Sequence, residues 1–284
     1  CRRSSQRALS RGDKISPKAI REFQTAILAN FRQSGRQFPW RETRDPYRIL
    51  VSEIMLQQTQ TDRVVPRYLD WLETFPSVEA LAKAPFARVL EKWIGLGYNR
   101  RARYLQEACK CIVDEYASIF PQTPSELEKL PGVGKYTASA VSTFAFGLPN
   151  AFIETNIRAV YLYFFYRDET GISDRELLER IEETLERNDP RTWYYALMDY
   201  GATLKKKIGN PNRNSRHYTK QSRFEGSLRQ ARGAVIRYIG TNGEARLDHI
   251  AESEGITLER IETAALELVG EGMVAESGGI YRIS

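Results

Sequence analysis

The stretch Leu130–Ala138, LPGVGKYTA, predicts a helical hairpin that binds a phosphate group. Before it, Thr123-Pro124-Ser125-Glu126 has the form of a capping box with proline at the first helical position. Pro131 ends this first helix, and the two glycines allow a turn that residues with a Cβ would adopt only under strain. A second helix starts near Lys135, and the amides of its first turn favour a phosphate oxygen. No P-loop lysine-serine pair follows, and an ordinary helix corner is the alternative interpretation.

Composition indicates a globular chain of two or three domains. It has 284 residues, of which 42% are hydrophobic and 27% charged, and no apolar run is long enough to span a membrane. Three cysteines are too few for a disulfide framework, so we expect a reducing, cytoplasmic location.

Charge is distributed unevenly along the chain. Residues 1–227 hold 36 Lys or Arg against 27 Asp or Glu, a net of +9, whereas residues 228–284 hold 6 against 9, a net of −3. The two parts together give the net charge of +6. A basic body suits a polyanionic partner such as nucleic acid, and the acidic end needs another explanation.

Helical patterns dominate the first 227 residues. We expect residues 1–15 to be a disordered basic tail, Ser16-Pro17 to start a helix, and Asp45-Pro46 to start another that runs to about Gln60. Strand patterns are nearly absent here, which predicts an all-helical fold. Further helical patterns cover about 61–75, 77–83, 86–93, 100–116, 136–147, 154–167, 174–188 and 191–203.

The end of the chain differs from its body. Residues 205–223 are basic and polar, and we expect a loop with an electrostatic role, a solvated linker being the alternative. After them, helices at about 228–239, 247–254 and 258–270 and a hairpin around Gly278-Gly279 predict a winged-helix-like module. Its third helix is acidic, so contact with a protein or a second copy is at least as favoured as DNA reading.

Five motifs occur in order along the chain: Phe38-Pro39-Trp40-Arg41, Asp45-Pro46-Tyr47, Ser52–Gln60, Gly95-Leu96-Gly97-Tyr98 and Leu130–Gly134. Together they resemble the helix-hairpin-helix (HhH-GPD) DNA glycosylases, most closely the MutY-type adenine DNA glycosylases, over roughly residues 17–204. Similar motifs occur in archaeal thymine–guanine mismatch glycosylases, whose hairpins can also carry a tyrosine at the position of Tyr136.

The resemblance implies a mainly α, two-lobed fold with the winged-helix-like module appended. One lobe would combine 16–45 with 150–204, and the other would be 46–149 with the hairpin. The basic loop at 205–227 would stand where most relatives carry four cysteines around an iron–sulfur cluster. This chain has no cysteine after Met198-Asp199, so we expect no such cluster. The module at 228–284 replaces the Nudix-like domain of enzymes that recognise 8-oxoguanine.

Two carboxylates carry the predicted chemistry. Glu53 lies mid-helix on an apolar stripe, which favours a raised pKa and general-acid work, although a glutamate that reaches water is the alternative. By resemblance Glu53 protonates the flipped base and helps to orient the attacking water. Glu154 occupies the position of the family's aspartate, which stabilises an oxocarbenium-like sugar, and Asn156 matches its asparagine. The arm of Glu154 is one methylene longer than that of aspartate, and small displacements can slow a reaction greatly.

Tyr136 predicts the reaction type. Relatives that form a Schiff base with the sugar carry a lysine at this position, and Lys135 lies one residue earlier, about 100° around the helix. The resemblance therefore implies a monofunctional glycosylase, with Tyr136 at the catalytic site.

The remaining site residues are expected to contact DNA. By resemblance Gln58 is the wedge in the vacated stack, while Leu56, Leu96 and Tyr98 bracket the opposite base; the alternative for Tyr98 is that it only packs its loop. The hairpin backbone at Leu130 and Val133 is the candidate site for a Na⁺ or K⁺ ion, with no other cofactor expected. Phosphate contacts are expected from Gly132, Val133, Gly134, Lys135, Lys205, Lys206, Lys207 and Arg213.

These observations predict a DNA glycosylase of base excision repair, located with the nucleoid. The first-choice substrate is adenine opposite guanine or 8-oxoguanine in duplex DNA. Thymine or uracil opposite guanine is the alternative substrate. A DNA-damage binder that no longer catalyses, with a protein partner on its acidic module, is the alternative class.

Overall fold

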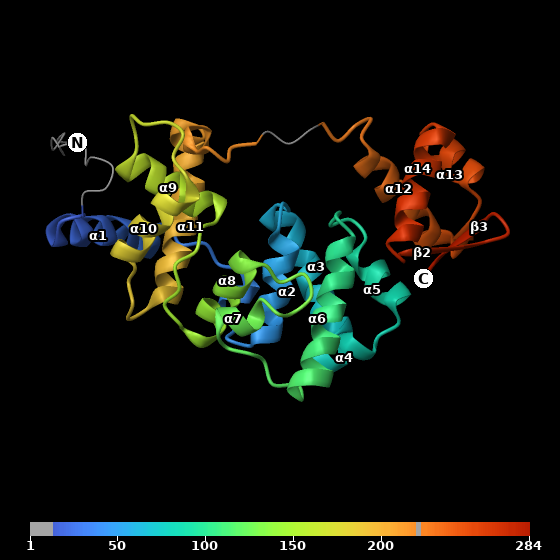
Figure 1. Ribbon diagram of the computed structural model, residues 1–284, viewed down its shortest axis with the longest axis horizontal. Coiled ribbons are helices and arrows are strands. Elements are labelled where there is room, and N and C mark those ends of the chain that lie inside the picture. The colour runs from blue at the N-terminus through green and yellow to red at the C-terminus, as the bar shows by residue number, and fades with distance from the viewer. Residues whose placement is uncertain (1–13, 220–222) are drawn as a thin grey trace. The chain divides into compact units, whose positions relative to one another are not determined.

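The computed structural model describes residues 14–219 and 223–284, which are mostly helical (Figure 1). Most of the expected disordered tail lies outside these residues, but Ile15 is 5% exposed and belongs to the core. Contacts divide the chain into two units. Unit 1 comprises the described residues within 1–46, 122–127 and 134–220, and unit 2 those within 47–121, 128–133 and 221–284.

Unit 1 is helical and contains both ends of the hairpin. The helix bounds confirm the starts at Pro17 and near Lys135 that the sequence predicts. Its elements are α1 (Pro17–Ser34), η1 (Pro39–Arg41), α7 (Pro124–Leu127), α8 (Lys135–Phe146), α9 (Thr155–Phe165), α10 (Asp174–Thr184), α11 (Pro190–Ile208) and η2 (Pro211–Asn214).

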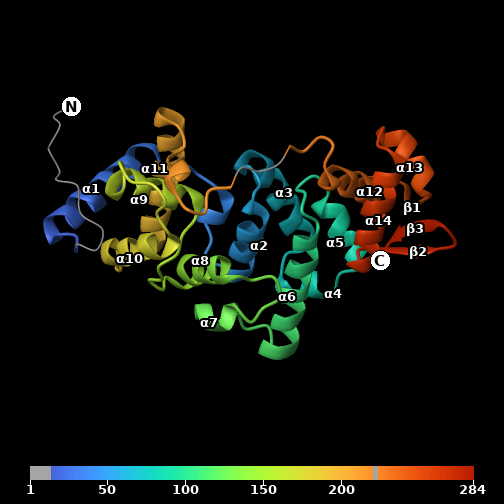
Figure 2. The ribbon, with the colours of Figure 1, turned by 45° about the horizontal axis from the view of Figure 1, so that its top comes forward.

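Unit 2 combines the remaining helices with a small sheet (Figure 2). Its elements are α2 (Pro46–Leu56), α3 (Thr61–Thr74), α4 (Val78–Lys83), α5 (Phe86–Trp93), α6 (Arg100–Tyr116), α12 (Leu228–Asn242), β1 (Glu244–Ala245), α13 (Leu247–Glu254), α14 (Leu258–Gly270), β2 (Val274–Ser277) and β3 (Ile280–Ile283).

Several helix ends differ from the sequence expectations: α7 ends at Leu127, before Pro131, and α10 ends at Thr184 rather than near residue 188. The helix expected to run to Gln60 ends at Leu56, because Gln58 has a φ of +54°, which no helical residue adopts. The basic segment expected as a loop from 205 is partly helical, since α11 continues to Ile208 and Lys205–Lys207 form its last turn. Lysines in a last turn interact favourably with the helix dipole, which explains the extension.

Local capping explains the starts of several helices. The Ser16 hydroxyl accepts a hydrogen bond from the Ala19 amide at 3.2 Å, with Pro17 at the first helical position. Ser173 and Glu176 form a reciprocal capping box at α10. These side chains satisfy amides that would otherwise lack partners, so the helix positions follow from local sequence.

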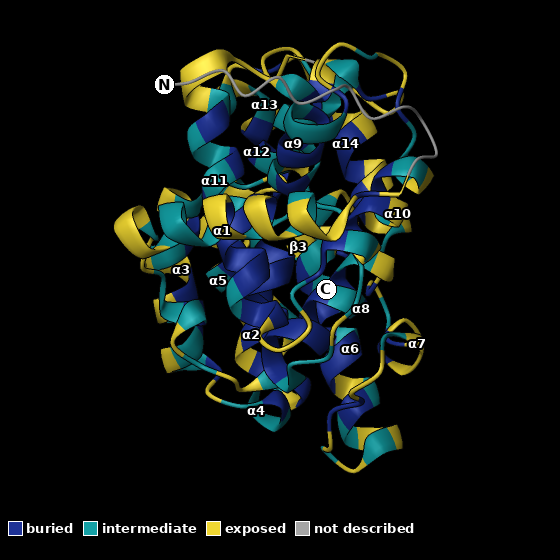
Figure 3. Cartoon of the chain, turned by 90° about the vertical axis from the view of Figure 1, so that its left-hand side faces the viewer, coloured by how far each residue is buried: buried dark blue, intermediate teal, exposed yellow. Residues whose placement is uncertain are grey.

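An aromatic cluster forms part of the core of unit 1. The Phe23 ring on α1 meets the rings of Tyr161 and Trp193 edge-on, at centroid distances of 5.4 and 5.6 Å. The opposite face of α1 is exposed (Figure 3). In unit 2, α2 is buried from Tyr47 to Met55 except at Arg48, as expected for a central helix that is apolar nearly all round.

A buried carboxylate ties the segment after α1 to α11. The Asp199 side chain is 4% exposed and accepts hydrogen bonds at 2.9 Å from both Arg41 guanidinium Nη atoms. It also accepts the Arg36 backbone amide at 2.8 Å and the Arg36 Nε at 2.7 Å. Burial acts to raise the pKa of Asp199, but the hydrogen bonds and charges of Arg41 and Arg36 outweigh it and lower the pKa.

The C-terminal module, residues 228–284, has the three helices that the sequence predicts. Its strands form an antiparallel sheet in the order β1-β3-β2, with Ala275 opposite Arg282. β1 is an addition to the two expected strands. The match of this module to a winged helix stays a prediction.

None of the helices in the described parts of the chain is long and apolar enough to cross a membrane.

We expect Asp199→Asn to destabilise the protein by about 3–5 kcal/mol, because it leaves the Arg41 charge buried without its partner. The pKa of Asp199 is lowered in the fold, so its stabilisation is complete above the ordinary aspartate pKa and is lost as pH falls through the lowered pKa. Urea unfolding at several pH values measures both effects. Asp248→Asn, at a side chain 52% exposed, is the control and should leave the midpoint unchanged; equal midpoints for both variants would contradict the assignment.

Candidate functional site

The turn of the hairpin requires glycine at position 132. Gly132 has a φ of +72°, and a Cβ there would lie 2.4 Å from the Cβ of Tyr104 on α6. The Leu130 carbonyl accepts the Val133 amide at 3.1 Å, and both side chains are buried. Backbone geometry and close packing therefore both exclude larger residues from this turn.

The start of α8 presents backbone to its surroundings. Gly134 precedes the helix without a side chain that caps it among the described residues, and both Gly134 and Lys135 are exposed. Such a helix start can bind an anion through its first amides. Tyr136 is half-buried, and its ring meets Phe152 edge-on at 5.8 Å between centroids.

Glu154 caps the start of α9 two residues after Phe152. Its Oε2 accepts the Asn156 backbone amide at 2.7 Å, and its Oε1 accepts the Asn156 Nδ2 at 2.9 Å. Both carboxylate oxygens therefore accept hydrogen bonds from Asn156. The side chain of Glu154, one methylene longer than that of aspartate, folds back toward the helix that it caps. A carboxylate oxygen has further lone pairs, so the group can still face a developing positive charge.

The end of α11 supports this arrangement (α9 and α11 in Figure 1). Lys205 Nζ donates to the Asn156 Oδ1 at 3.0 Å and to the Thr155 Oγ1 at 3.2 Å. A Cβ on Gly201 would lie 2.2 Å from the Asn156 carbonyl oxygen, so glycine allows the two helices to approach closely. Lys205 was expected to contact DNA phosphates, but its half-buried side chain instead holds the residues beside Glu154.

The basic segment after α11 also reaches α9. Asn212 on η2 is buried, and its Nδ2 donates to the Thr155 carbonyl at 3.0 Å and to the Thr155 Oγ1 at 2.8 Å. The Arg216 amide donates to the Ile172 carbonyl at 2.9 Å. Lys206, Lys207 and Arg213 are exposed. The segment is thus a structural brace whose exposed cations include Lys206, Lys207 and Arg213.

Burial and the neighbouring groups shift the pKa of Glu154 in opposite directions. Burial raises the pKa of the Glu154 carboxyl, although the Asn156 amide and the Lys205 ammonium act to lower it. Burial also lowers the pKa of Lys205, against the attraction of Glu154. Each group therefore favours the charged form of the other.

Glu53 lies in unit 2, in the middle of α2, and is 6% exposed. Its helix neighbours Ile49 and Leu50 are at most 1% exposed, which confirms the apolar stripe that the sequence predicts. Glu154 and Tyr136 lie in unit 1.

Two of the candidate base-contacting residues, Gln58 and Tyr98, have an unusual backbone conformation. Gln58 and Tyr98 have φ of +54° and +50°, which side chains with a Cβ seldom adopt. Both are exposed, Tyr98 by 37%. Leu56 is half-buried, while Leu96 is 4% exposed, and the contact of both with the opposite base stays a prediction. Residues with a strained backbone, such as Gln58 and Tyr98, are concentrated at functional sites.

Arg101 on α6, which the sequence analysis missed, connects these two segments. Its guanidinium donates to the carbonyls of Ile54 at 2.8 Å and Gln57 at 2.6 Å, and to the Gly97 carbonyl at 2.9 Å. Burial lowers its pKa to about 10, so it stays charged near neutral pH. Among many arginines, only its place three residues after the Gly-Leu-Gly-Tyr motif could have signalled this role.

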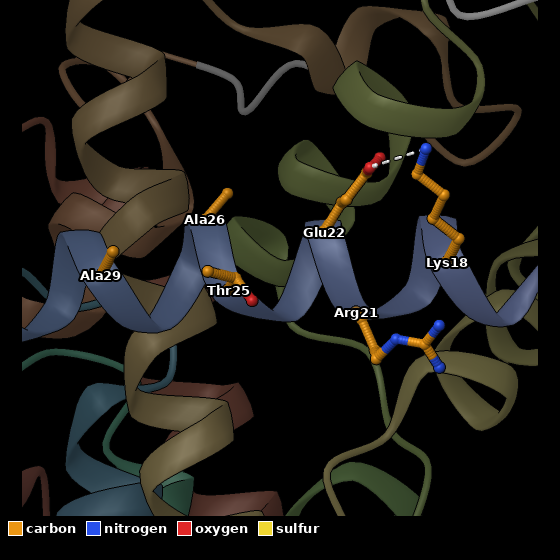
Figure 4. Close-up of a pocket in the computed structure, with 6 residues that line it drawn as sticks. All are labelled: Lys18, Arg21, Glu22, Thr25, Ala26 and Ala29. Carbon is orange, nitrogen blue, oxygen red and sulfur yellow. Dashed lines mark ion pairs between the residues drawn. The ribbon is translucent and has the colours of Figure 1, made fainter.

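Neither the hollow along α1 nor a cluster of metal-binding side chains among the described residues adds a second site. A shallow hollow lies along α1 and is lined by side chains of that one helix, including the Lys18–Glu22 pair at 3.9 Å (Figure 4). Within residues 14–219 and 223–284, no three His, Cys, Asp or Glu side chains gather to hold a metal ion.

The residues do not fit an iron–sulfur cluster. The segment after α11 offers lysine, asparagine and arginine and no thiol. Cys109 and Cys111 lie on α6 in unit 2, and burial raises the pKa of the Cys109 thiol, which disfavours the thiolate that a cluster needs.

Comparison with known proteins agrees with this geometry. Residues 51–190 match the family described as HhH-GPD superfamily base excision DNA repair protein. The thymine/uracil-DNA glycosylase of Methanothermobacter thermautotrophicus is 33% identical over 196 residues, covering 68% of this chain and 88% of that protein. The chain therefore belongs to the HhH-GPD superfamily.

Other relatives share the same region. The adenine DNA glycosylase of Buchnera aphidicola subsp. Baizongia pistaciae is 34% identical over 187 residues, which is 64% of this chain. The chain spans only 52% of that relative's length. A solved structure of a thermostable thymine-DNA glycosylase superposes with a TM-score of 0.58 at 30% identity, covering 65% of this chain and 87% of that one.

We expect Gly201→Ala to destabilise unit 1 by about 1–3 kcal/mol, because the new Cβ would overlap the Asn156 carbonyl. Thermal unfolding measures the loss. Gly233→Ala is the matched control, since it lies inside α12 with no atom within 4 Å of its Cβ position and should gain helix propensity of about 1 kcal/mol. A stability of Gly201→Ala at or above the wild type would show that α9 and α11 do not pack this closely.

Proposed function

We propose that this chain is a monofunctional DNA glycosylase that hydrolyses the N-glycosidic bond of a flipped base in a mismatch. The observation that carries the proposal is Glu53, a carboxyl 6% exposed in the middle of an apolar helix, in a chain of this superfamily. Burying a carboxyl is costly, and buried ionisable groups are concentrated at functional sites, so the presence of Glu53 in this helix favours a chemical role.

Glu53 acts first, as the general acid. Its proton goes to a ring nitrogen of the flipped base, which makes the base a better leaving group. The electron pair of the glycosidic bond leaves with the base. The resulting carboxylate then helps to orient the water that attacks the sugar.

Glu154 stabilises the sugar while the bond breaks. The sugar develops positive charge in an oxocarbenium-like transition state, and a fixed carboxylate lowers the energy of that state. Asn156 holds both oxygens of Glu154, and Lys205 holds Asn156. This preorganisation supports activity despite the additional methylene of Glu154.

Tyr136 supports hydrolysis without strand cleavage. A phenol cannot form the Schiff base that a lysine amine forms with an opened sugar. The Tyr136 ring is packed against Phe152, and it borders the backbone that leads to Glu154. We assign it to shaping the sugar site, so that the product is an intact strand with an abasic site.

Adenine opposite guanine or 8-oxoguanine is the first substrate, in keeping with the motif around Glu53 and the adenine DNA glycosylase relative. Thymine or uracil opposite guanine is the second. A specific observation favours it, namely that the chain covers 88% of a thymine/uracil-DNA glycosylase but only 52% of the adenine enzyme.

The DNA backbone is the proposed partner of the hairpin and of the exposed cations. The amides at Gly134 and Lys135 suit one phosphate, with a Na⁺ or K⁺ ion on the Leu130 and Val133 backbone. Lys206, Lys207 and Arg213 supply exposed charge, as a polyanion requires. Such a protein would act in the cytoplasm at the nucleoid. A protein partner of the C-terminal module stays a prediction.

We expect the wild type to release adenine from A·G or A·8-oxoguanine duplexes and to leave strands that break only after alkali treatment. Glu53→Gln should lower the single-turnover rate by a factor of 10² or more, since the acid is lost while the shape is kept. Denaturing gels with and without alkali measure both results.

The same gels distinguish the alternatives. Cleavage at T·G or U·G alone would assign the second substrate. Binding of mismatched duplexes without excision of any base would favour a damage-binding scaffold, and full activity of Glu53→Gln would remove Glu53 from its role.

Lys205→Met should move the acid limb of the excision rate to higher pH. Glu154 must be ionised to stabilise the sugar, and Lys205 acts to lower its raised pKa, so removing the ammonium raises that pKa further. Single-turnover rates between pH 5 and 9 measure the limb.

Lys206→Met is the control, because it removes the same charge from the same helix turn at an exposed position. Coinciding acid limbs for the two variants would show that Lys205 does not act through Glu154.

A further inference from the structure

The C-terminal module contacts α5 and α6 within unit 2. A Cβ on Gly240 of α12 would lie 2.7 Å from the Ile94 Cδ1, so the two surfaces meet closely there. The Arg103 guanidinium on α6 donates to the Gly272 carbonyl, and Arg100 lies 3.8 Å from the Glu271 carboxylate. The module therefore approaches the loop that precedes α6 and carries Tyr98.

Arg229 of α12 contacts Tyr98 itself. Its Nη1 donates to the Tyr98 hydroxyl at 2.7 Å. Its guanidinium carbon also lies 5.8 Å from the centre of the Tyr98 ring and 5.7 Å from that of Phe224. One cation thus interacts with two aromatic rings, one from the glycosylase core and one from the segment that leads into α12.

These rings remain accessible. Tyr98 is 37% exposed and Phe224 is 57% exposed. Large exposed aromatic rings are costly in water, and a π face next to a guanidinium is a surface on which nucleobases stack. Arg101 approaches the Tyr98 ring to 5.6 Å, so two guanidinium groups hold this tyrosine.

Two acidic side chains at the end of α14 are paired with an arginine of α12 within the module. Glu267 and Glu271 accept hydrogen bonds from Arg232 of α12, at 2.7 and 2.6 Å. The side chains here that suit DNA are instead Arg229, at the beginning of α12, and Phe224, in the segment that leads into that helix. The negative charge of the module is therefore compatible with a DNA contact on this one side.

We propose that Arg229 and Phe224 extend the base-contacting surface of Tyr98, so that the C-terminal module takes part in holding the base opposite the excised one. The ligand is an unpaired nucleobase of duplex DNA, bound by stacking and by the nearby cation. This inference rests on the proposed function, and it makes Arg229 a positioning residue for Tyr98 and Phe224 a stacking residue.

The test compares Arg229→Gln and Phe224→Ala with the wild type on duplexes that carry 2-aminopurine opposite an uncleavable abasic analogue. Stacking quenches 2-aminopurine, so the wild type should change its fluorescence on binding, and each variant should reduce that change. We expect affinity for this duplex to fall roughly 5- to 150-fold, the effect of losing one base–aromatic stack. Affinity for fully paired duplex should change much less.

Arg237→Gln is the matched control, since it removes an arginine from the same helix at an exposed position paired with Glu254. Thermal unfolding of all variants checks folding, and Tyr98→Phe, which keeps the ring but not the hydroxyl, should show a partial loss. Fluorescence and affinity of Arg229→Gln and Phe224→Ala equal to those of Arg237→Gln, with an active wild type, would overturn this inference alone. A wild type that excises no base would overturn the proposed function as well.

Discussion

Unit 2 depends on one half-buried cation, the guanidinium of Arg101. The last carbonyls of α2 and those of the loop before α6 point toward the same place, where water has little access. Unsatisfied carbonyls there would cost several kcal/mol in total. A planar guanidinium with five donors can serve both segments at once, which a lysine ammonium cannot do in the same geometry. The positions of Gln58 and Tyr98 follow from this one side chain.

Unit 1 uses a comparable device around Glu154. Gly201 brings α11 close to α9, Lys205 reaches the Asn156 side chain, and Asn212 binds Thr155. Three residues from the end of α11 and from η2 thus hold a helix start at which a carboxylate sits. Hydrogen bonds from an asparagine and a lysine therefore order the start of α9 and the segment after α11 together.

Much of the fold could be predicted because its signals are local. Serine and proline at Ser16-Pro17 fix a helix start through neighbouring amides, and the turn at Gly132 follows from backbone sterics. The direction of Lys205 could not be predicted, since helix periodicity alone does not show which neighbour a half-buried lysine meets. The contact of Leu96 with DNA is predicted by resemblance alone, and the burial of its side chain could be seen only from tertiary packing. Arg101 was missed because its acceptors come from residues about 44 positions away in sequence.

The positive φ of Gln58 and Tyr98 has a consequence for how the protein searches DNA. Both loops are already bent in the free chain, so their ordering is part of folding and is not repeated at each encounter with a duplex. A protein that moves along DNA meets thousands of intact base pairs for every damaged one. Because the loops that carry Gln58 and Tyr98 are already in place, the time that the protein spends at each base pair depends on how easily that pair opens. The rate of the search is therefore set by base-pair opening in the DNA rather than by motion of the protein.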